Sequence, residues 1–429
     1  MSVSELHRPL PWHLLPDTAG VGGDGWLEVG GCSVADLVAE FGTPLFAYDE
    51  AHLRARCREA AEAFPGGAAY ATKAFLCRAM ARLAHEEGLA LDVASGGELH
   101  VALAAGVPGE RLVLHGNNKS TDEIARALEA GVGRIVVDSD DELDRIEGLV
   151  AGGARRPTVL LRITPGVEAH THEFVRTGQI DSKFGFGVAT GAAEAALARA
   201  EASPHVDLVG IHVHIGSQVF VADFFHQAVE VLAPFVSRFG LPEFVVGGGL
   251  GVAYVEGEEA PTIAQWGRSV RDACAEAGIT ARIGAEPGRS IVAGAALTLY
   301  TVGTVKDLPG IRTYVAVDGG MSDNPRPVLY GSGYETFLPR APRAERGRTV
   351  TVVGKHCESG DLLVRDGQVP ADLVVGDVLA TPVTGAYGHS MGSNYNKVPR
   401  PPVVFCRAGD ARLVVRRETE DDLLATDLG

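Results

Sequence analysis

The sequence predicts an α/β protein that combines a (β/α)8 barrel with a C-terminal, mainly β domain. Between residues 68 and 286, eight short apolar runs of strand type alternate with helical stretches rich in Ala, Leu, Glu and Arg. Such alternation implies a parallel sheet, and eight units of this kind suit a closed barrel. After residue 291 short strands follow one another without long helices between them, which indicates a second domain that is antiparallel in part.

The boundaries follow from this pattern. We assign residues 47–295 to the barrel, and residues 1–46 together with 296–429 to the β domain. Helices are expected between the strands, for example over residues 121–131 and 140–149. The expected barrel strands are 68–71, 89–93, 112–115, 134–138, 159–163, 208–214, 244–247 and 281–286, and those of the β domain are 297–302, 313–318, 349–353, 361–364, 377–380 and 402–405.

The two ends of the chain carry weaker signals. Residues 26–29 have the pattern of a short strand that could join the β domain. A helix with a capping-box start is predicted for residues 33–41, followed by a strand at 44–48. The charged residues 408–429 are expected to form a mobile tail.

Composition excludes several classes of partner. The chain has 429 residues, of which 46% are hydrophobic, and a net charge of −17, which argues against nucleic acid and acidic membrane surfaces as partners. No signal-peptide pattern and no apolar run of membrane length is present. The six cysteines are scattered without a CxxC pair, as in proteins of a reducing compartment. We therefore expect a cytoplasmic protein.

Polar residues gather where the predicted barrel strands end. Active sites of such barrels are built at this rim, so chemistry is expected here. The residues are Lys73, Asp92, Ser95, His115, Asn117, Asp138, Arg162, His214, Gly247 to Gly249 and Glu286.

Lys73 lies between the first predicted strand and the helix after it. By itself this stretch favours a surface lysine on a loop, and the alternative is a lysine that forms a Schiff base with a carbonyl cofactor. Its place on a rim with so many polar residues favours the catalytic interpretation.

Two motifs near the last strands suit a pyridoxal cofactor. Gly247–Gly249 would let backbone N–H groups approach a phosphate, although a plain flexible turn is the alternative. Glu286 would keep a pyridine nitrogen protonated, which makes the ring an electron sink. The alternative for Glu286 is a salt bridge with Arg289.

Three other places have functional and structural interpretations. His214 would stack on the cofactor ring and Ser217 would bind its phosphate, whereas His212 is expected to be a core histidine. Cys357 stands near two carboxylates, Glu358 and Asp361, which would raise the pKa of its thiol and suit a proton donor; an inert small residue is the alternative. The residues His170, His172 and Glu173 suggest a metal only weakly, and no metal is expected.

The order of these motifs resembles that of the diaminopimelate decarboxylases. These are pyridoxal-phosphate enzymes of fold type III, with an alanine-racemase-like barrel and a β domain. The resemblance covers roughly residues 26–405, and 115–120 and 168–174 resemble this branch more narrowly. The motifs are Tyr70–Ala74, His212–Ser217, Gly247–Gly249, Glu286–Arg289, Cys357–Asp361 and Gly385–Tyr387.

The resemblance implies a role for each matched residue. Lys73, His214 and Cys357 would be catalytic, and Cys357 with Glu358 would enter the site from the partner subunit of a head-to-tail homodimer with shared active sites. The implied cofactor-binding residues are Lys73, His214, Ser217, Gly247, Gly248, Gly249, Glu286, Pro287, Gly288, Arg289 and Tyr387. The implied substrate-binding residues are Arg289, Arg326, Tyr330, Glu358 and Tyr387.

The expected reaction is decarboxylation of meso-2,6-diaminopimelate at its D centre to L-lysine and CO2. The substrate is thus a small amino acid, and the alternatives are ornithine, arginine or a carrier-bound glutamyl group. A racemase is disfavoured because Glu286, rather than an arginine, faces the ring nitrogen. An inactive regulator is disfavoured by the presence of Lys73 and Cys357. Pro325, Pro327 and His389 depart from the expected pattern.

Overall fold

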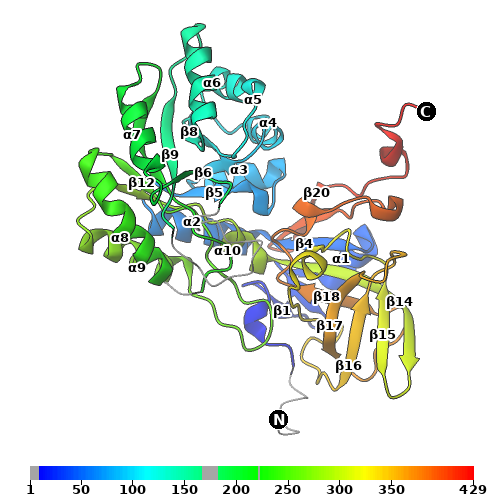
Figure 1. Cartoon of the computed structure of the whole chain (residues 1–429). Helices are drawn as coiled ribbons and strands as arrows, with labels where there is room; N and C mark the ends of the chain where they lie inside the picture. Colours follow the sequence, from blue (N-terminus) through cyan, green and yellow to red (C-terminus); the bar gives the residue numbers. More distant parts are fainter. Residues whose placement is uncertain (1–8, 167–181, 221–222) are drawn as a thin grey trace. The chain divides into compact units, whose positions relative to one another are not determined.

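The computed structural model describes residues 9–166, 182–220 and 223–429 (Figure 1). The chain forms two compact units. The barrel unit comprises Arg56–Gly251 and Ala260–Ser290, and the β unit comprises Met1–Ala55, Val252–Glu259 and Ile291–Gly429. In the described part of the chain, no helix combines the length and the apolar character needed to cross a lipid bilayer.

The barrel unit contains the predicted closed parallel sheet. Backbone hydrogen bonds join its first and last strands, from Ala69 N to Ala285 O (2.9 Å) and from Ala285 N to Gly67 O (3.0 Å). This closure confirms the barrel. Around it the strands run in the order β5 (Ala69–Ala71), β6 (Ala90–Val93), β7 (Leu112–Leu114), β8 (Arg134–Val137), β9 (Thr158–Thr164), β11 (Asp207–His212), β12 (Glu243–Val245) and β13 (Arg282–Gly284), with the short β10 (Phe186–Gly187) beside β9.

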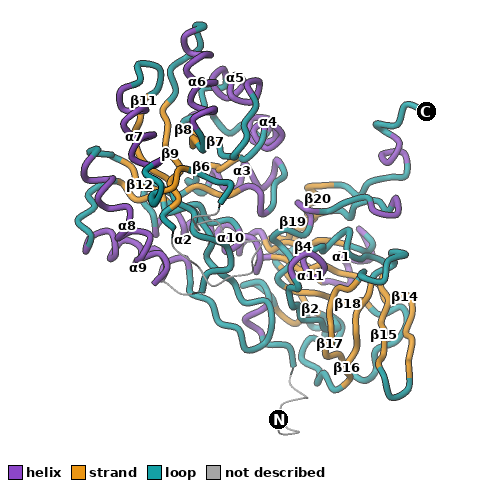
Figure 2. Tube along the Cα trace, in the orientation of Figure 1, coloured by secondary structure: helices purple, strands orange, loops and turns teal. Residues whose placement is uncertain are grey.

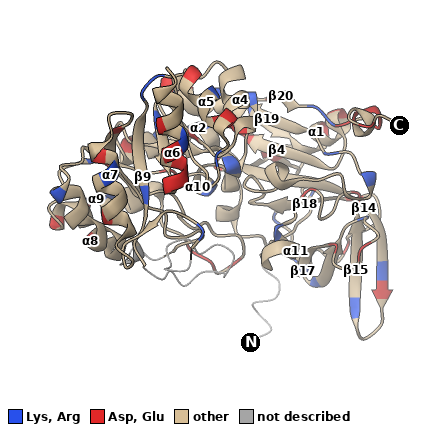
Figure 3. Ribbon diagram, turned by 45° about the horizontal axis from the view of Figure 1, so that its top comes forward, with Lys and Arg blue, Asp and Glu red and all other residues tan. Residues whose placement is uncertain are grey.

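Helices surround these strands (Figure 2). Capping boxes begin α5 at Ser120 and α9 at Thr262, where they satisfy backbone N–H groups that a helix leaves unpaired. The first turn of α6 is acidic, which suits the positive end of the helix dipole (Figure 3). The helices are α2 (Glu50–Ala63), α3 (Arg78–Glu86), α4 (Gly96–Ala104), α5 (Thr121–Glu129), α6 (Asp140–Ala151), α7 (Ala192–Ala202), α8 (Asp223–Arg238), α9 (Ile263–Glu276) and α10 (Arg289–Val292).

A buried ion pair fixes the loop after β7. The Nζ atom of Lys119 donates to Glu142 Oε1 at 2.6 Å and to the carbonyl oxygens of Gly116 and Val136. The two side chains are 2% and 1% exposed. Burying both charges is acceptable because each meets its partner and further hydrogen bonds. The pair ties the loop that follows His115 to helix α6.

The β unit is built on a second, mixed sheet. Most neighbouring strands are antiparallel, while the pairs β15–β16 and β4–β19 are parallel. The predicted mainly β domain is therefore confirmed. The strands are β4 (Leu45–Asp49), β14 (Ala296–Leu308), β15 (Arg312–Val317), β16 (Arg348–Val353), β17 (Leu362–Val369), β18 (Val378–Pro382), β19 (Val403–Arg407) and β20 (Asp410–Val415).

Details at the ends of the chain differ from expectation. Residues 410–415 were expected in a mobile tail, but they form β20, which pairs with β19. Charged residues on its open edge hide the strand signal. Residues 47–49, expected in the barrel, lie in β4, between β14 and β19. The strand near Trp26, β2 (Leu27–Val29), pairs with β1 (Gly20–Val21) and β3 (Cys32–Ser33) in a separate small sheet.

The predicted capping box of the first helix is also absent. Helix α1 (Val34–Phe41) begins where expected, but Ser33 makes no side-chain cap hydrogen bond. The apolar face of the helix therefore accounts for its position better than the cap does, because Val34 and Leu37 are buried.

Candidate active site

Lys73 stands at the C-terminal end of the first barrel strand. It lies in a single 3-10 turn, Thr72–Ala74, directly after β5, and its side chain is exposed. Two buried hydrogen bonds fix this junction, from Tyr70 Oη to Phe75 O (2.6 Å) and from Thr72 Oγ1 to Asp92 O (2.8 Å). The motif residues Tyr70 and Thr72 thus hold the backbone that presents the lysine.

His214 is held as a neutral ring at the same rim. Its Nδ1 atom accepts a hydrogen bond from Gly248 N at 3.3 Å. Burial, together with the positive charges of Lys73 and Arg162, lowers the pKa of His214 well below its ordinary value. The tautomer with a proton on Nε2 follows from the bond at Nδ1. A neutral imidazole with a fixed orientation is suited to lie against another aromatic ring.

The glycines after β12 are required by close backbone contacts. A Cβ atom on Gly248 would lie 2.3 Å from Glu286 O, and one on Gly249 would lie 2.2 Å from Gly216 O. Glu286 N donates to Gly247 O at 2.6 Å. These contacts fix the turn where three backbone segments meet. The glycines therefore form a glycine junction rather than a plain flexible turn.

Ser217 and Arg289 meet beside this junction. Arg289 Nη2 donates to Ser217 Oγ at 2.9 Å. Gln218, which follows Ser217, has a φ of 61°, a left-handed conformation that non-glycine residues seldom adopt. A hydroxyl, a guanidinium and glycine backbone together form a donor set that suits a phosphate.

The carboxylate of Glu286 lies between two histidines inside the barrel. Its Oε1 is 2.9 Å from His115 Nε2, and its Oε2 is 2.9 Å from His212 Nε2. The three groups are close enough to ligate a metal ion, with all ligand atoms within 4.8 Å of one another. The contact between His212 Nε2 and Glu286 Oε2, however, is a hydrogen bond, and that between His115 Nε2 and Glu286 Oε1 is a direct ion-pair contact.

The histidines keep this buried carboxylate ionised. Burial alone would raise the pKa of Glu286, but the charges and hydrogen bonds of His115 and His212 outweigh it and hold the pKa well below the ordinary value. For His115, burial is outweighed by Asp92 and Glu286, which raise its pKa. Burial lowers the pKa of His212 to about 4. His212 is therefore neutral at pH 7, whereas the raised pKa of His115 favours its charged form.

Acidic and basic side chains share this interior. Asp92, Asp138 and Glu286 lie among His115 and Arg162, and all five residues are buried. Burial raises the pKa of Asp92 to about 6. A buried carboxylate with a lowered pKa, such as that of Glu286, favours a positive charge beside it, such as a protonated ring nitrogen.

In the β unit, Arg326 is a buried cation surrounded by tyrosines. Its Nη1 donates to Tyr334 Oη at 2.5 Å, and its guanidinium lies 4.1 Å from the centre of the Tyr254 ring. Arg326 is 4% exposed, and its Nε atom has no hydrogen-bond acceptor. Within the described ranges no carboxylate pairs with Arg326. Its donors thus suit a carboxylate from a bound molecule.

The cysteine motif forms an exposed loop of the β unit. Cys357 is exposed, and its backbone N–H donates to Asn396 Oδ1 at 3.0 Å. Glu358 accepts from Gly360 N at 3.1 Å, while Asp361 is buried and accepts from Met321 N and His356 N. The loop is therefore braced by its carboxylates and leaves the thiol accessible.

Known proteins share both the sequence and the fold. Residues 50–293 match the pyridoxal-binding domain of the pyridoxal-dependent decarboxylases. The diaminopimelate decarboxylase of Mycobacterium tuberculosis is 48% identical, over 93% of this chain and 94% of the relative, and that of Bacillus subtilis is 46% identical, over 94% and 95%. The chain belongs to the diaminopimelate decarboxylase family. The crystal structure of the M. jannaschii diaminopimelate decarboxylase agrees, with a TM-score of 0.89 and 32% identity over 96% of this chain and 98% of that one.

As a pyridoxal-dependent decarboxylase, the chain needs a site that fits its cofactor, and the barrel rim does. An exposed lysine, a neutral histidine and an ionised buried carboxylate come from three different strands but meet at one rim. The glycine junction with Ser217 and Arg289 supplies donors for a phosphate. The carboxylate of Glu286, whose pKa is lowered, suits a protonated pyridine ring.

The remaining residues of the expected site belong to the β unit. Tyr387, with a φ of 60°, and the half-buried Tyr330, at the end of α11 (Arg326–Tyr330), belong to the β unit. Pro325 and Pro327 begin α11, where a fixed φ is favourable. His389 packs edge-on against Phe46, with ring centres 5.9 Å apart, so it has a structural contact. His170, His172 and Glu173 lie outside the described residues.

Sequence reasoning missed the partners of the key charges. His115 and Asp92 were placed on the rim without a role, yet they set the charge state of Glu286. Tyr254 and Tyr334, which enclose Arg326, were not considered at all. The only available signal for either tyrosine was a position shortly after glycines, Gly251 before Tyr254 and Gly331 and Gly333 before Tyr334.

We predict that His115→Phe destabilises the apo-protein most at low pH. A histidine with a raised pKa contributes stability that is complete below its unfolded pKa, about 6.5, and is lost as pH rises through the folded pKa. The loss should be about 3–5 kcal/mol near pH 6, the usual cost of breaking a buried ion pair, and smaller at pH 9. Denaturant unfolding between these pH values measures it.

The groups facing His115 are Asp92, Glu286, Arg162 and the edge of the His212 ring. His100→Phe, on the exposed face of α4, is the matched control and should change stability little. A loss from His115→Phe that grows with pH would contradict the charge assignment.

Proposed function

We propose that this chain removes CO2 from the D centre of meso-2,6-diaminopimelate and releases L-lysine, using pyridoxal phosphate at the barrel rim. The observation that carries the proposal is the ionised carboxylate of Glu286, buried between His115 and His212 on the rim that also bears Lys73. Membership in the diaminopimelate decarboxylase family supports the choice of substrate.

Residues of the barrel unit would hold the cofactor. Lys73 would bind it covalently, Glu286 would keep a proton on its ring nitrogen, and the neutral ring of His214 would lie against it. When bound, the cofactor supplies the electron sink for the charge left by loss of CO2. The phosphate is held by the groups around the glycine junction, which are Ser217, Gly247, Gly248, Gly249, Pro287, Gly288 and Arg289, with Tyr387 from the β unit.

Residues of the β unit would select the substrate. The buried Arg326 takes the distal carboxylate of diaminopimelate, assisted by Arg289, Tyr330 and Tyr387. Glu358 takes the distal ammonium group. Ornithine and lysine lack a distal carboxylate, so each would leave a buried guanidinium without its acceptor, a penalty of about 1–3 kcal/mol or more. This difference separates the proposal from the alternative of an ornithine-type decarboxylase.

Cys357 would donate a proton to the carbon that has lost CO2. Its thiol is exposed on a braced loop, so it is free to face another subunit. We therefore propose a homodimer in which Cys357 and Glu358 of one protomer complete the site of the other. The six free cysteines, five of them buried, suit the reducing cytoplasm, where we place the enzyme.

Lys73→Ala is expected to abolish both cofactor attachment and turnover. Purified wild-type protein should show the visible absorption of the bound cofactor and release lysine and CO2 from meso-diaminopimelate. The variant should lose the absorption band and the activity, because no other group can make the covalent bond. Lys306→Ala, an exposed lysine of β14, is the control. Full turnover by Lys73→Ala would refute the cofactor assignment.

Mixing Lys73→Ala and Cys357→Ala subunits should restore activity. Random exchange makes half of the dimers mixed, and each mixed dimer keeps one intact site of two, so about a quarter of wild-type activity is expected. Subunit exchange is verified with two tags of different mass. Complete exchange without recovery would show that each site is built from one chain.

Arg326→Met should erode selectivity for meso-diaminopimelate. Loss of a hydrogen-bonded charge contact predicts a decrease in kcat/KM of about 10–100-fold for diaminopimelate, with little change for lysine or ornithine. Arg312→Met is the control, since Arg312 also lies over a tyrosine, 5.7 Å from the ring centre of Tyr314. Equal use of ornithine and diaminopimelate by the wild-type protein would overturn the substrate assignment.

A further inference from the structure

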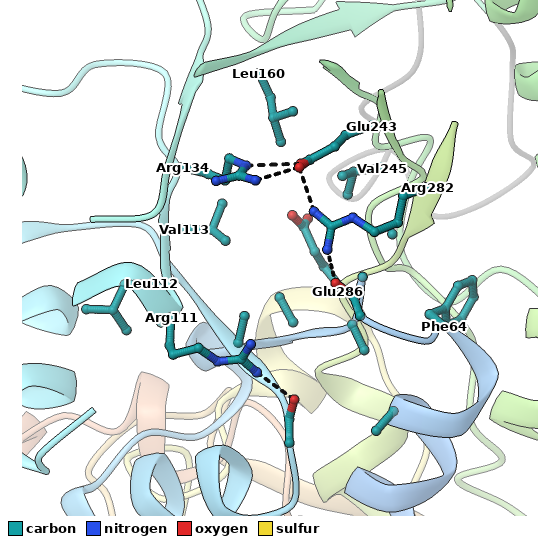
Figure 4. Close-up of a pocket in the computed structure, with 18 of the residues that line it drawn as sticks. Phe64, Arg111, Leu112, Val113, Arg134, Leu160, Glu243, Val245, Arg282 and Glu286 are labelled. Carbon is teal, nitrogen blue, oxygen red and sulfur yellow. Dashed lines mark hydrogen bonds and ion pairs between the residues drawn. The ribbon is translucent and has the colours of Figure 1, made fainter. Parts of the chain in front are cut away.

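A cavity of about 250 Å³ opens at the end of the barrel opposite the catalytic rim (Figure 4). Its lining includes the first residues of six strands, which all lie at their N-terminal ends: Ala69, Ala90, Leu112, Arg134, Glu243 and Arg282. The exposed residues Gly66, Gly88, Glu110 and Arg282 also line it, so the cavity reaches the surface.

The mouth of the cavity is formed by charged side chains. Figure 4 shows Arg134 and Arg282 on two sides of the Glu243 carboxylate. Arg134 Nε donates to Glu243 Oε2 at 3.0 Å, and Arg282 Nη2 donates to Oε1 at 2.6 Å. Arg111 Nη2 donates to Gly88 O at 2.6 Å. These hydrogen bonds hold the charged side chains at the mouth in place, and the side chains do not fill the opening.

Glu286 also lines the cavity. Barrel interiors of this type are normally packed with large branched side chains. Here several positions are small: Ala69, Ala90 and Gly284 line the space, and a Cβ atom on Gly284 would lie 2.8 Å from Gly67 O. Ala90 and Val113 are only half-buried although they lie in barrel strands. The carboxylate at the rim therefore borders a space that leads out through the opposite end.

Water is the occupant that this lining favours. A purely apolar cavity stays dry, whereas water needs two to four polar partners. This cavity has charged groups at both ends and backbone carbonyl oxygens of Gly66 and Gly88 near its mouth. At roughly 30 Å³ per molecule, its volume suffices for about eight waters.

We propose that this cavity holds a chain of water molecules that hydrates Glu286 from the N-terminal end of the barrel and carries protons between that carboxylate and solvent. The proposal rests on the role assigned to Glu286 and goes beyond it. A cofactor and substrate on the rim would cover Glu286 from the other side. The water chain then hydrates the ionised carboxylate and gives protons a path between it and solvent without opening the reaction site.

A crystal structure of the wild-type holoenzyme tests the water chain directly. Ordered waters should run from Arg282 and Arg111 to within hydrogen-bond distance of Glu286. A cavity that is dry, or closed by side chains between Arg134 and Glu286, would overturn the proposal. This measurement does not depend on activity.

Chemical rescue tests the route. In Glu286→Ala, formate should enter the cavity and occupy the place of the lost carboxylate. It should restore the cofactor absorption and raise the activity of the variant about tenfold. Ala90→Leu in the same background fills the cavity and should remove the rescue, whereas Ala90→Ser, which leaves the space open, should retain it. Val113→Phe serves as a second filling variant if Ala90→Leu does not fold.

Each outcome is decisive. Equal rescue with the cavity filled, or crystals of Glu286→Ala soaked in formate that show no formate in this cavity, would overturn the route. Wild-type absorption and activity in Glu286→Ala without formate would instead refute the proposed function of Glu286. That result would leave the water chain to be judged by the wild-type crystals.

Discussion

The structure of the barrel interior depends on keeping one buried carboxylate ionised. Burial opposes the charge of Glu286, and the protein counters it with His115 and His212, one on each oxygen. The pKa of His115 is in turn raised by Asp92 as well as by Glu286. Because each charge in this network depends on the next, no member is an independent substitution site.

The backbone around Glu286 is fixed by equally specific contacts. Its amide donates to Gly247 O, and its carbonyl oxygen lies where a side chain on Gly248 would be. Gly248 N also orients His214. On the other side, the buried pair of Lys119 and Glu142 holds the loop that begins after His115. Rigid placement of this kind lets a site act without reorganising its dipoles during the reaction.

The sequence predicted the features that depend on hydrophobic periodicity and on where parallel strands end. It did not reveal contacts between residues that lie far apart in the sequence. All eight barrel strands were found because apolar runs and helical stretches alternate, and Lys73, His214 and Glu286 were placed on one rim because parallel strands end together. Strand β20 was missed because its charged residues mask the alternation. The sequence that begins at Ser33 resembles a capping box, but the Ser33 side chain does not make the capping hydrogen bond. The pairing of His115 with Glu286 joins positions 171 residues apart, which no local pattern reveals.

Each unit carries a buried charged group that suits a ligand of the opposite charge. In the barrel it is the carboxylate of Glu286; in the β unit it is the guanidinium of Arg326, which has tyrosines but no carboxylate among its described partners. A buried charge without a charged partner costs stability in the free protein. In the proposed function a protonated cofactor ring would lie against the first group and a substrate carboxylate against the second. Binding would then release this cost, and only ligands with both the right charge and the right place for it would gain this energy.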